Sequence, residues 1–145
     1  MTNSVIQLQG LDHLVIRAND SEQLIRFYCD VLGCTIDRQT GPEIGLTQLR
    51  AGNSQIDILT PGGRLSKEKG ALPGAEAHNM DHFCLQVEPF DGEAIQAYLK
   101  SHGVETTGFG DRFGATGYGP SLYLNDPEGN TVELKGPPIK DSASS

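Results

Sequence analysis

Two stretches of the chain share one pattern of polar and apolar positions. Each opens with an Asp-His pair and continues as an apolar run in which alternate residues can face one side, as in a β-strand. The stretches are Leu11-Asp12-His13-Leu14-Val15-Ile16 and Met80-Asp81-His82-Phe83-Cys84-Leu85. Two such copies in a chain of 145 residues predict one module repeated in tandem.

A helix is predicted after each of these strands. Its start is marked by an N-cap residue, Asp20 or Ser21 in the first copy and Asp91 in the second. Its end is marked by Gly33 in the first copy and Gly103 in the second. Between cap and glycine, apolar residues recur at the spacing of one helical face. Both halves therefore begin with the same order of elements.

Each half ends in a strand with one carboxylate between apolar residues, Ile56-Asp57-Ile58 in the first and Val132-Glu133-Leu134 in the second. Turn-forming residues at 51–54 and 125–130 place a hairpin before each of these strands. We therefore expect an α+β fold, in which two tandem βαβββ modules form a curled, mostly antiparallel sheet. The expected bounds are 10–136 for a single domain, about 10–60 for module one, 61–79 for the linker, 80–136 for module two, and 1–9 and 137–145 for the tails.

Composition narrows the range of partners. The formal net charge of −8 argues against nucleic acid and anionic membranes, since both need a basic surface. No apolar run approaches the roughly 20 residues of a membrane span, and the N-terminus lacks a secretion-signal pattern, so we expect a cytoplasmic protein. The cysteines Cys29, Cys34 and Cys84 lack C-x-x-C spacing and are interpreted as reduced core thiols, with a catalytic nucleophile as the alternative.

Five glycines punctuate residues 107–120. A phosphate-binding loop is disfavoured, because no helix follows the stretch and no Gly-Lys-Ser/Thr closes it. We expect a plain connector or a mobile loop at the rim of a site.

The repeat also pairs candidate metal ligands. His13 and His82 open equivalent strands, and Asp57 and Glu133 occupy equivalent places on the last strand of each half. Twofold symmetry can bring two imidazoles and two carboxylates together on the floor of a trough, a set that suits a divalent ion. In the alternative interpretation, the histidines are hydrogen-bonded structural residues and the carboxylates face solvent.

Two further side chains are candidate substrate contacts. The turn at 125–130 is expected to place Tyr123 opposite Glu133, which would bring a hydroxyl beside the metal. Arg17 shares a face of its strand with His13, and it is either a surface charge or a clamp for an anionic group.

These residues resemble the vicinal oxygen chelate superfamily, which includes glyoxalase I, extradiol dioxygenases, fosfomycin-resistance enzymes and bleomycin-binding proteins. The resemblance covers residues 10–136. It implies the glyoxalase/bleomycin resistance/dihydroxybiphenyl dioxygenase fold, metal ligands at His13, His82 and Glu133, and a fourth ligand or base at Asp57. The motifs that carry it are Leu-Asp-His-Leu-Val-Ile, Phe-Tyr-Cys-Asp-Val-Leu-Gly, Met-Asp-His-Phe-Cys-Leu and Tyr-Leu-Asn-Asp-Pro-Glu-Gly-Asn-Thr-Val-Glu-Leu.

The subfamilies imply different reactions. Arg17 matches an arginine of glyoxalase I, but Pro61 stands where that enzyme has an asparagine, and Asp57 where it has a glutamate. Tyr123 matches a tyrosine of extradiol dioxygenases, whose additional active-site histidines are replaced here. Fosfomycin enzymes share the pattern of Ser121 and Tyr123.

The resemblance implies a divalent-metal-dependent, glyoxalase-I-like lyase or isomerase, whose small substrate chelates the ion through adjacent oxygens. The alternatives are an iron-dependent extradiol-type dioxygenase and a metal-free drug- or ligand-binding protein like the bleomycin-resistance proteins. The ion would be Ni, Zn, Mn or Fe. A homodimer is expected, in which His13 of one chain can join His82 and Glu133 of the other. The implied substrate contacts are Arg17, Gln48, Ser121 and Tyr123.

Overall fold

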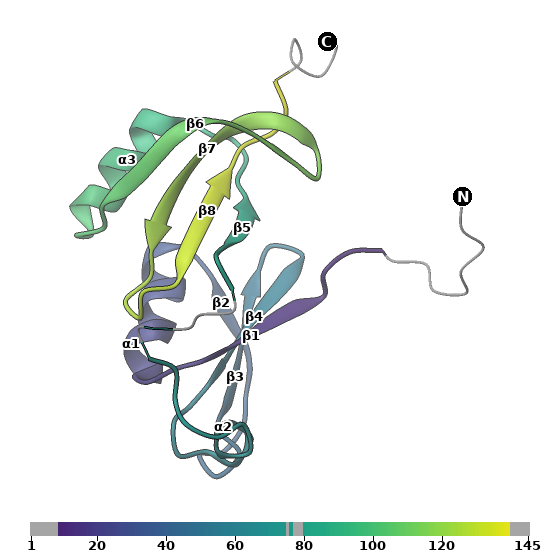
Figure 1. Ribbon diagram of the computed structural model, residues 1–145, viewed down its shortest axis with the longest axis vertical. Helices are drawn as coiled ribbons and strands as arrows, with labels where there is room; N and C mark the ends of the chain where they lie inside the picture. The colour runs from purple at the N-terminus through teal and green to yellow at the C-terminus, as the bar shows by residue number, and fades with distance from the viewer. Residues whose placement is uncertain (1–8, 75, 77–79, 140–145) are drawn as a thin grey trace. The chain divides into compact units, whose positions relative to one another are not determined.

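The computed structural model describes residues 9–74, 76 and 80–139. Most of both predicted tails and part of the predicted linker therefore lie outside the described residues. The described chain divides into two compact units, one ending at Leu72 and the other starting at Pro73. Each unit contains one four-stranded mixed sheet, drawn in purple to blue and in teal to yellow in Figure 1. The predicted α+β class and the βαβββ order of both halves are confirmed.

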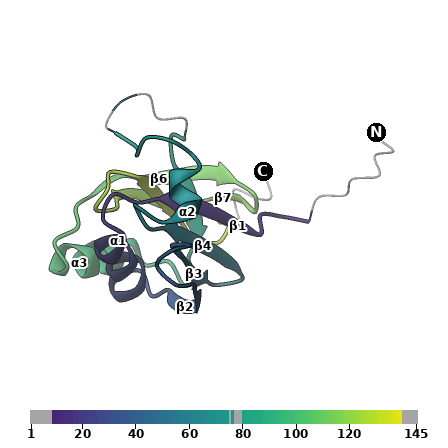
Figure 2. The same cartoon turned by 90° about the horizontal axis from the view of Figure 1, so that it is seen from below.

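Unit 1 has the sheet order β1-β4-β3-β2, in which β1 and β4 run parallel and the other neighbours antiparallel. Figure 2 shows the helix α1, which contacts β4. A short helix, α2, was not predicted and occupies part of the expected linker. The elements are β1 (His13–Arg17), α1 (Ser21–Arg26), η1 (Phe27–Val31), β2 (Thr35–Gln39), β3 (Leu46–Ala51), β4 (Ser54–Leu59) and α2 (Arg64–Lys67).

Unit 2 repeats this arrangement with the order β5-β8-β7-β6, in which β5 and β8 are the parallel pair. The helix α3 runs along one side of this sheet (Figure 1). The elements are β5 (Phe83–Gln86), α3 (Gly92–Ser101), β6 (Thr106–Gly114), β7 (Gly117–Asn125) and β8 (Thr131–Lys135).

The helix starts follow the predicted capping. The Asp20 side chain accepts a hydrogen bond from the Gln23 backbone N–H at 3.1 Å, and Asp91 accepts one from Ala94 at the same distance. An acceptor at this position satisfies one of the backbone donors that a helix start leaves unpaired. The caps therefore fix where α1 and α3 begin after their strands.

Alternation along the strands divides each sheet into an apolar and a polar face. In β8, Val132 and Leu134 are buried on one face, and Glu133 and Lys135 lie on the other. In each unit the apolar face forms the core together with residues of the helices of that unit. The buried core residues are Ile16, Ala18, Leu24, Phe27, Tyr28, Cys34, Leu49, Ile56, Ile58 and Leu59 in unit 1, and Leu99, Leu122, Leu124, Val132 and Leu134 in unit 2.

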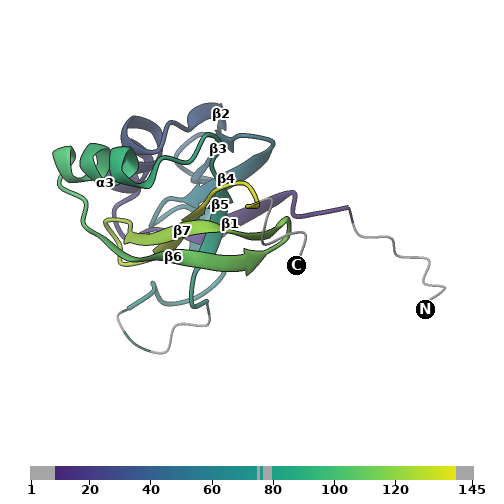
Figure 3. The same ribbon diagram turned by 90° about the horizontal axis from the view of Figure 1, so that it is seen from above.

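The glycine-rich stretch is a hairpin and not the predicted loop or connector. Residues 106–114 and 117–125 form the paired strands β6 and β7, which Figure 3 shows side by side. A strand rich in glycine is hard to predict from sequence, because glycine has no side chain that could show the alternation of polar and apolar residues. Here the missing side chains make room: a methyl group at Gly114 would lie 3.1 Å from Lys135 Cε.

No helix in the described part of the chain is both long and apolar enough to cross a membrane.

Gly108 gives a test of this hairpin, because it lies at a register irregularity of β6 with a φ of +65°. A methyl group there would come within 2.8 Å of Tyr123 Cδ2 and 3.1 Å of Arg112 Nη2. We expect Gly108→Ala to lower the free energy of unfolding by about 1–3 kcal/mol in urea titrations. The control is Gly110→Ala, since a methyl group at Gly110 meets no atom within 4 Å. Equal stability of the two variants would contradict this account of the irregularity.

Candidate functional site

Unit 2 places an imidazole against a buried carboxylate. His82 Nε2 lies 3.1 Å from Glu133 Oε1, and Glu133 is only 6% exposed. His82 Nδ1 lies 2.7 Å from the Asp81 carboxylate. An ionised carboxylate only accepts hydrogen bonds. Nδ1 therefore carries a proton and donates a hydrogen bond to Asp81. A neutral imidazole then presents a lone pair to Glu133, so the short distance requires a proton or a cation between these two acceptors.

Unit 1 contains the corresponding pair. His13 Nδ1 lies 2.7 Å from Asp12 Oδ2, and His13 Nε2 lies 4.0 Å from Asp57 Oδ2. The hydrogen bond to Asp12 is the main reason that the pKa of His13 is raised. Asp57 is 3% exposed, and its Oδ1 has no hydrogen-bond partner among the described residues. A buried carboxylate oxygen without a donor is costly, so Asp57 is suited to a cation.

The two pairs are equivalent in strand register. Val15 is the parallel-strand partner of Asp57, and Cys84 is the partner of Glu133. In both units the histidine stands two positions before that partner, and so on the same face as the carboxylate. The repeat seen in the sequence therefore extends to the pairing of the strands that carry these side chains.

Each unit by itself supplies two groups that could bind a metal ion, one histidine ring and one buried carboxylate. Among residues 9–74, 76 and 80–139, no three His, Cys, Asp or Glu side chains form a group that could hold a metal ion. One imidazole and one carboxylate per unit, with each histidine oriented by the preceding aspartate, are what the described geometry provides.

Aromatic and hydroxyl groups extend the polar face of unit 2. Tyr123 is the cross-strand partner of Glu133, as the turn at 125–130 predicts. Its ring meets the His82 ring edge to face, with centroids 5.3 Å apart. Ser121 is fully buried, and its Oγ accepts a hydrogen bond from Arg112 Nη1 at 2.7 Å. The Arg112 guanidinium also lies over the Tyr123 ring, 4.6 Å from its centroid.

Sequence reasoning missed Arg112 and Lys135 of this face. Lys135 follows Leu134 at the end of the last strand, and Arg112 is the more informative case. It lies inside the glycine-rich stretch, where no alternation marks a strand. The one available signal was a single arginine among glycines in 107–120, which by itself is as typical of a solvent-exposed loop.

Gln48 occupies the place in unit 1 that Tyr123 occupies in unit 2, opposite the carboxylate. Its Oε1 accepts from Arg38 Nε at 2.7 Å, and its Nε2 donates to Asp57 Oδ2 at 3.3 Å. The bond from Arg38 fixes which end of the amide faces the carboxylate. Gln48 is therefore a donor that holds Asp57 in place.

The Arg17 guanidinium forms hydrogen bonds with backbone carbonyl oxygens. It donates to the carbonyl oxygens of Ser66 at 2.9 Å, Gly70 at 2.7 Å, Ala71 at 3.1 Å and Lys69 at 3.5 Å. These bonds fasten α2 and the segment that follows it to β1. The sequence predicts either a surface charge or an anion clamp for Arg17, and in the structure its guanidinium instead holds backbone carbonyl groups in place.

Cys84 lies on the polar face beside Glu133. The prediction of a core thiol is wrong for Cys84, which is exposed, whereas Cys34 is buried and Cys29 is half-buried. Partial desolvation by its neighbours is still the main cause that raises the pKa of the Cys84 thiol to about 11, and the Glu133 charge adds to this effect. A thiol with such a pKa stays protonated near neutral pH, so Cys84 is poorly suited to act as a nucleophile.

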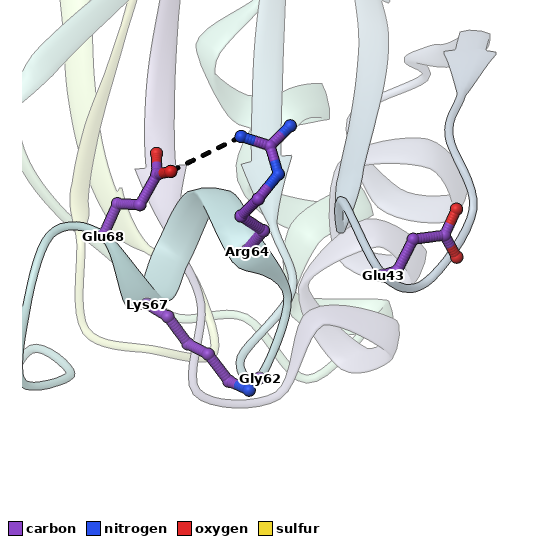
Figure 4. Close-up of a pocket in the computed structure, with 5 residues that line it drawn as sticks. All are labelled: Glu43, Gly62, Arg64, Lys67 and Glu68. Atoms are coloured by element: carbon purple, nitrogen blue, oxygen red, sulfur yellow. Dashed lines mark hydrogen bonds and ion pairs between the residues drawn. The ribbon is translucent and has the colours of Figure 1, made fainter.

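A separate hollow of about 480 Å³ lies beside α2 (Figure 4). Its lining consists of Glu43, Gly62, Arg64, Lys67 and Glu68, and Arg64 forms an ion pair with Glu68 at 3.4 Å. None of the predicted site residues lines this hollow.

Several known proteins resemble the chain over most of its length. Human mitochondrial methylmalonyl-CoA epimerase is 30% identical over 140 residues, which cover 93% of this chain and 78% of that protein. The ethylmalonyl-CoA/methylmalonyl-CoA epimerase of Cereibacter sphaeroides is 33% identical over 131 residues, which cover 86% of this chain and 96% of that protein.

Solved structures share the fold. A protein from the mobile metagenome of V. Pseudocholerae, VPC_CASS1, superimposes with a TM-score of 0.71 at 26% identity, covering 92% of this chain and 98% of that one. A lactoylglutathione lyase from Agrobacterium tumefaciens superimposes with a TM-score of 0.64 at 18% identity, covering 89% of this chain and 94% of that one.

A family model matches residues 10–134, a span that contains both histidine–carboxylate pairs and every described strand except the last residue of β8. That model describes the Glyoxalase/Bleomycin resistance protein/Dioxygenase superfamily, and the chain belongs to this superfamily.

Proposed function

We propose that the chain is a metal-dependent isomerase that epimerises a small acyl thioester by moving the proton on the carbon next to the carbonyl. The observation that carries the proposal is the pairing of a histidine nitrogen with a buried carboxylate in each unit, at equivalent register. The names of the two epimerases above support this class of reaction and a 2-alkylmalonyl thioester as the substrate.

The donor set fits one divalent ion. His13, His82 and Glu133 would hold it, with Asp57 as the fourth ligand. Imidazole nitrogen and carboxylate oxygen suit Ni²⁺, Zn²⁺, Mn²⁺ and Fe²⁺. The distance of 3.1 Å between His82 Nε2 and Glu133 Oε1 already brings two of these ligand atoms together. A bound ion would act as a Lewis acid on the substrate oxygens.

A carboxylate that is released from the ion would act as the general base for the proton transfer. Epimerisation requires one group that removes a proton from one face of the carbon and another that returns a proton to the opposite face. Asp57 and Glu133 are the buried carboxylates of the two polar sheet faces, and the repeat supplies one from each unit. Gln48 and Tyr123, their cross-strand partners, would orient the base and the substrate.

Asp57 separates this proposal from its rivals. An extradiol-type dioxygenase needs two histidines and one carboxylate, which would leave Asp57 buried with one unbonded oxygen and no function. A metal-free binding protein needs neither histidine–carboxylate pair. Proton transfer on both faces of the substrate carbon requires a second carboxylate, and Asp57 provides it.

Exchange of substrate hydrogen with solvent tests the proposal. In deuterium oxide with added Ni²⁺, Zn²⁺, Mn²⁺ or Fe²⁺, we expect the protein to exchange the hydrogen on carbon 2 of methylmalonyl-CoA, measured by mass spectrometry. Asp57→Asn and Glu133→Gln should each slow the exchange by about 10²–10⁴-fold, because each removes a general base. The control is Asp30→Asn, at an exposed residue of η1.

Absence of exchange with all four ions would refute the proposed reaction. Full exchange by the Asp57→Asn variant would leave Glu133 as the only base and would favour a three-ligand site.

Assembly gives a second prediction. We expect a homodimer in sedimentation, and a mixture of inactive His13→Ala and His82→Ala chains distinguishes two arrangements of its sites. If each site takes His13 from one chain and His82 from the other, random pairing restores about a quarter of wild-type activity, since half of the dimers are mixed and each has one intact site. If each site lies within one chain, mixing restores nothing. A fully active monomer would contradict the dimer.

A further inference from the structure

Two cations on the polar face of unit 2 lack an acidic partner among the described residues. Lys135 is the cross-strand partner of Ser121, and Arg112 is the partner of Gly119. In the part of the chain that the structure describes, the ion pairs within 4.0 Å include neither cation. Both lie on the face that carries Glu133, at register positions toward the β6–β7 hairpin end.

The Arg112 guanidinium is held in one orientation. Nη1 donates to Ser121 Oγ at 2.7 Å and to the Ser121 carbonyl at 3.5 Å, and the guanidinium stacks on Tyr123. The positive φ of Gly108 and its lack of a side chain leave space for Nη2. A guanidinium fixed in this way loses little conformational entropy when it binds a ligand.

Its remaining donors are open. Among the described residues, Nε and Nη2 of Arg112 have no hydrogen-bond acceptor, and neither is one of the buried polar atoms without a partner. Both nitrogens are therefore reached by solvent. Two N–H groups of a guanidinium edge match the two oxygens of a carboxylate or the oxygens of a phosphate.

Lys135 adds a second positive charge. It is only 5% exposed, and Nζ lies 3.3 Å from the position that a methyl group at Gly119 would take. Among the described residues, Nζ is not one of the buried polar atoms without a partner, so this ammonium group, like the free edge of Arg112, is reached by solvent. An anion bound beside Ser121 would compensate this charge.

We propose that Arg112 and Lys135 bind the free carboxylate of the substrate, next to the His82–Glu133 pair. The identity of the substrate rests on the proposed function, but the anion site itself does not. Arg17 cannot serve in the same way without giving up its four carbonyl acceptors. Ser121 and Tyr123 act as positioning residues for Arg112.

Calorimetric titration with methylmalonate, and separately with coenzyme A, tests the site and distinguishes a carboxylate from a phosphate as its ligand. Arg112→Gln should weaken methylmalonate binding by about 10–100-fold, the usual contribution of a charged hydrogen bond, and leave coenzyme A binding unchanged. The methylmalonate affinity of Arg112→Lys should lie between those of Arg112→Gln and wild type, because lysine keeps the positive charge but cannot present two parallel N–H groups. The control is Arg26→Gln, at an exposed residue of α1.

Two results would overturn the proposal: unchanged methylmalonate affinity in Arg112→Gln, or a loss confined to coenzyme A. A readout that needs no variant is the NMR signal of the Arg112 Nε–H in the wild-type protein, which should shift on addition of methylmalonate. An unshifted signal also overturns the proposal, even where Arg112→Gln fails to fold.

Failure of this site and failure of the proposed function give different results. If wild type exchanges the substrate hydrogen and Arg112→Gln keeps the same KM, the anion site is wrong and the reaction stands. If wild type exchanges nothing yet binds methylmalonate through Arg112, the reaction is wrong and the anion site stands.

Discussion

The parallel pairing between the first and last strand of each unit is the constraint on which the site depends. This pairing sets Val15 beside Asp57 and Cys84 beside Glu133, and it leaves each histidine two positions away on the same face. Because side chains alternate along a strand, a shift of one residue in either pair would move the carboxylate into the apolar core. The burial of Ile56, Ile58, Val132 and Leu134 on the opposite faces fixes the register.

Electrostatics then gives these faces their chemistry. Buried carboxylates in a chain of net charge −8 need positive partners, and the described structure supplies few. Among the described residues, Asp57 receives one hydrogen bond, from Gln48, and Glu133 Oε1 lies 3.1 Å from His82 Nε2. The same face of unit 2 holds Arg112 and Lys135, which form no ion pair within the described part of the chain. The proposed metal ion and negatively charged substrate would supply a cation for the carboxylates and an anion for the basic side chains.

Much of this arrangement could be predicted from the sequence. The repeated Asp-His strand start, the helix caps and the last-strand carboxylates are local patterns, and each maps directly onto a register position. Tyr123 could be placed opposite Glu133 because a short turn fixes hairpin register.

The rest depends on contacts that no local pattern encodes. The strand β6 is rich in glycine, so it shows no alternation, and the role of Arg112 depends on an irregularity at Gly108. The engagement of Arg17 depends on carbonyl oxygens of residues 66–71, which are far along the chain from β1. The short helix α2 has too few residues to show a period.

The central claim is that the two histidine–carboxylate pairs bind one and the same ion. Titration calorimetry of the metal-depleted protein, prepared without a His tag, measures this most directly. We expect one divalent ion per chain, with affinity reduced at least about tenfold in both His13→Ala and His82→Ala. Two ions per chain, or unchanged affinity in His13→Ala, would show that the pairs act separately and would contradict the claim.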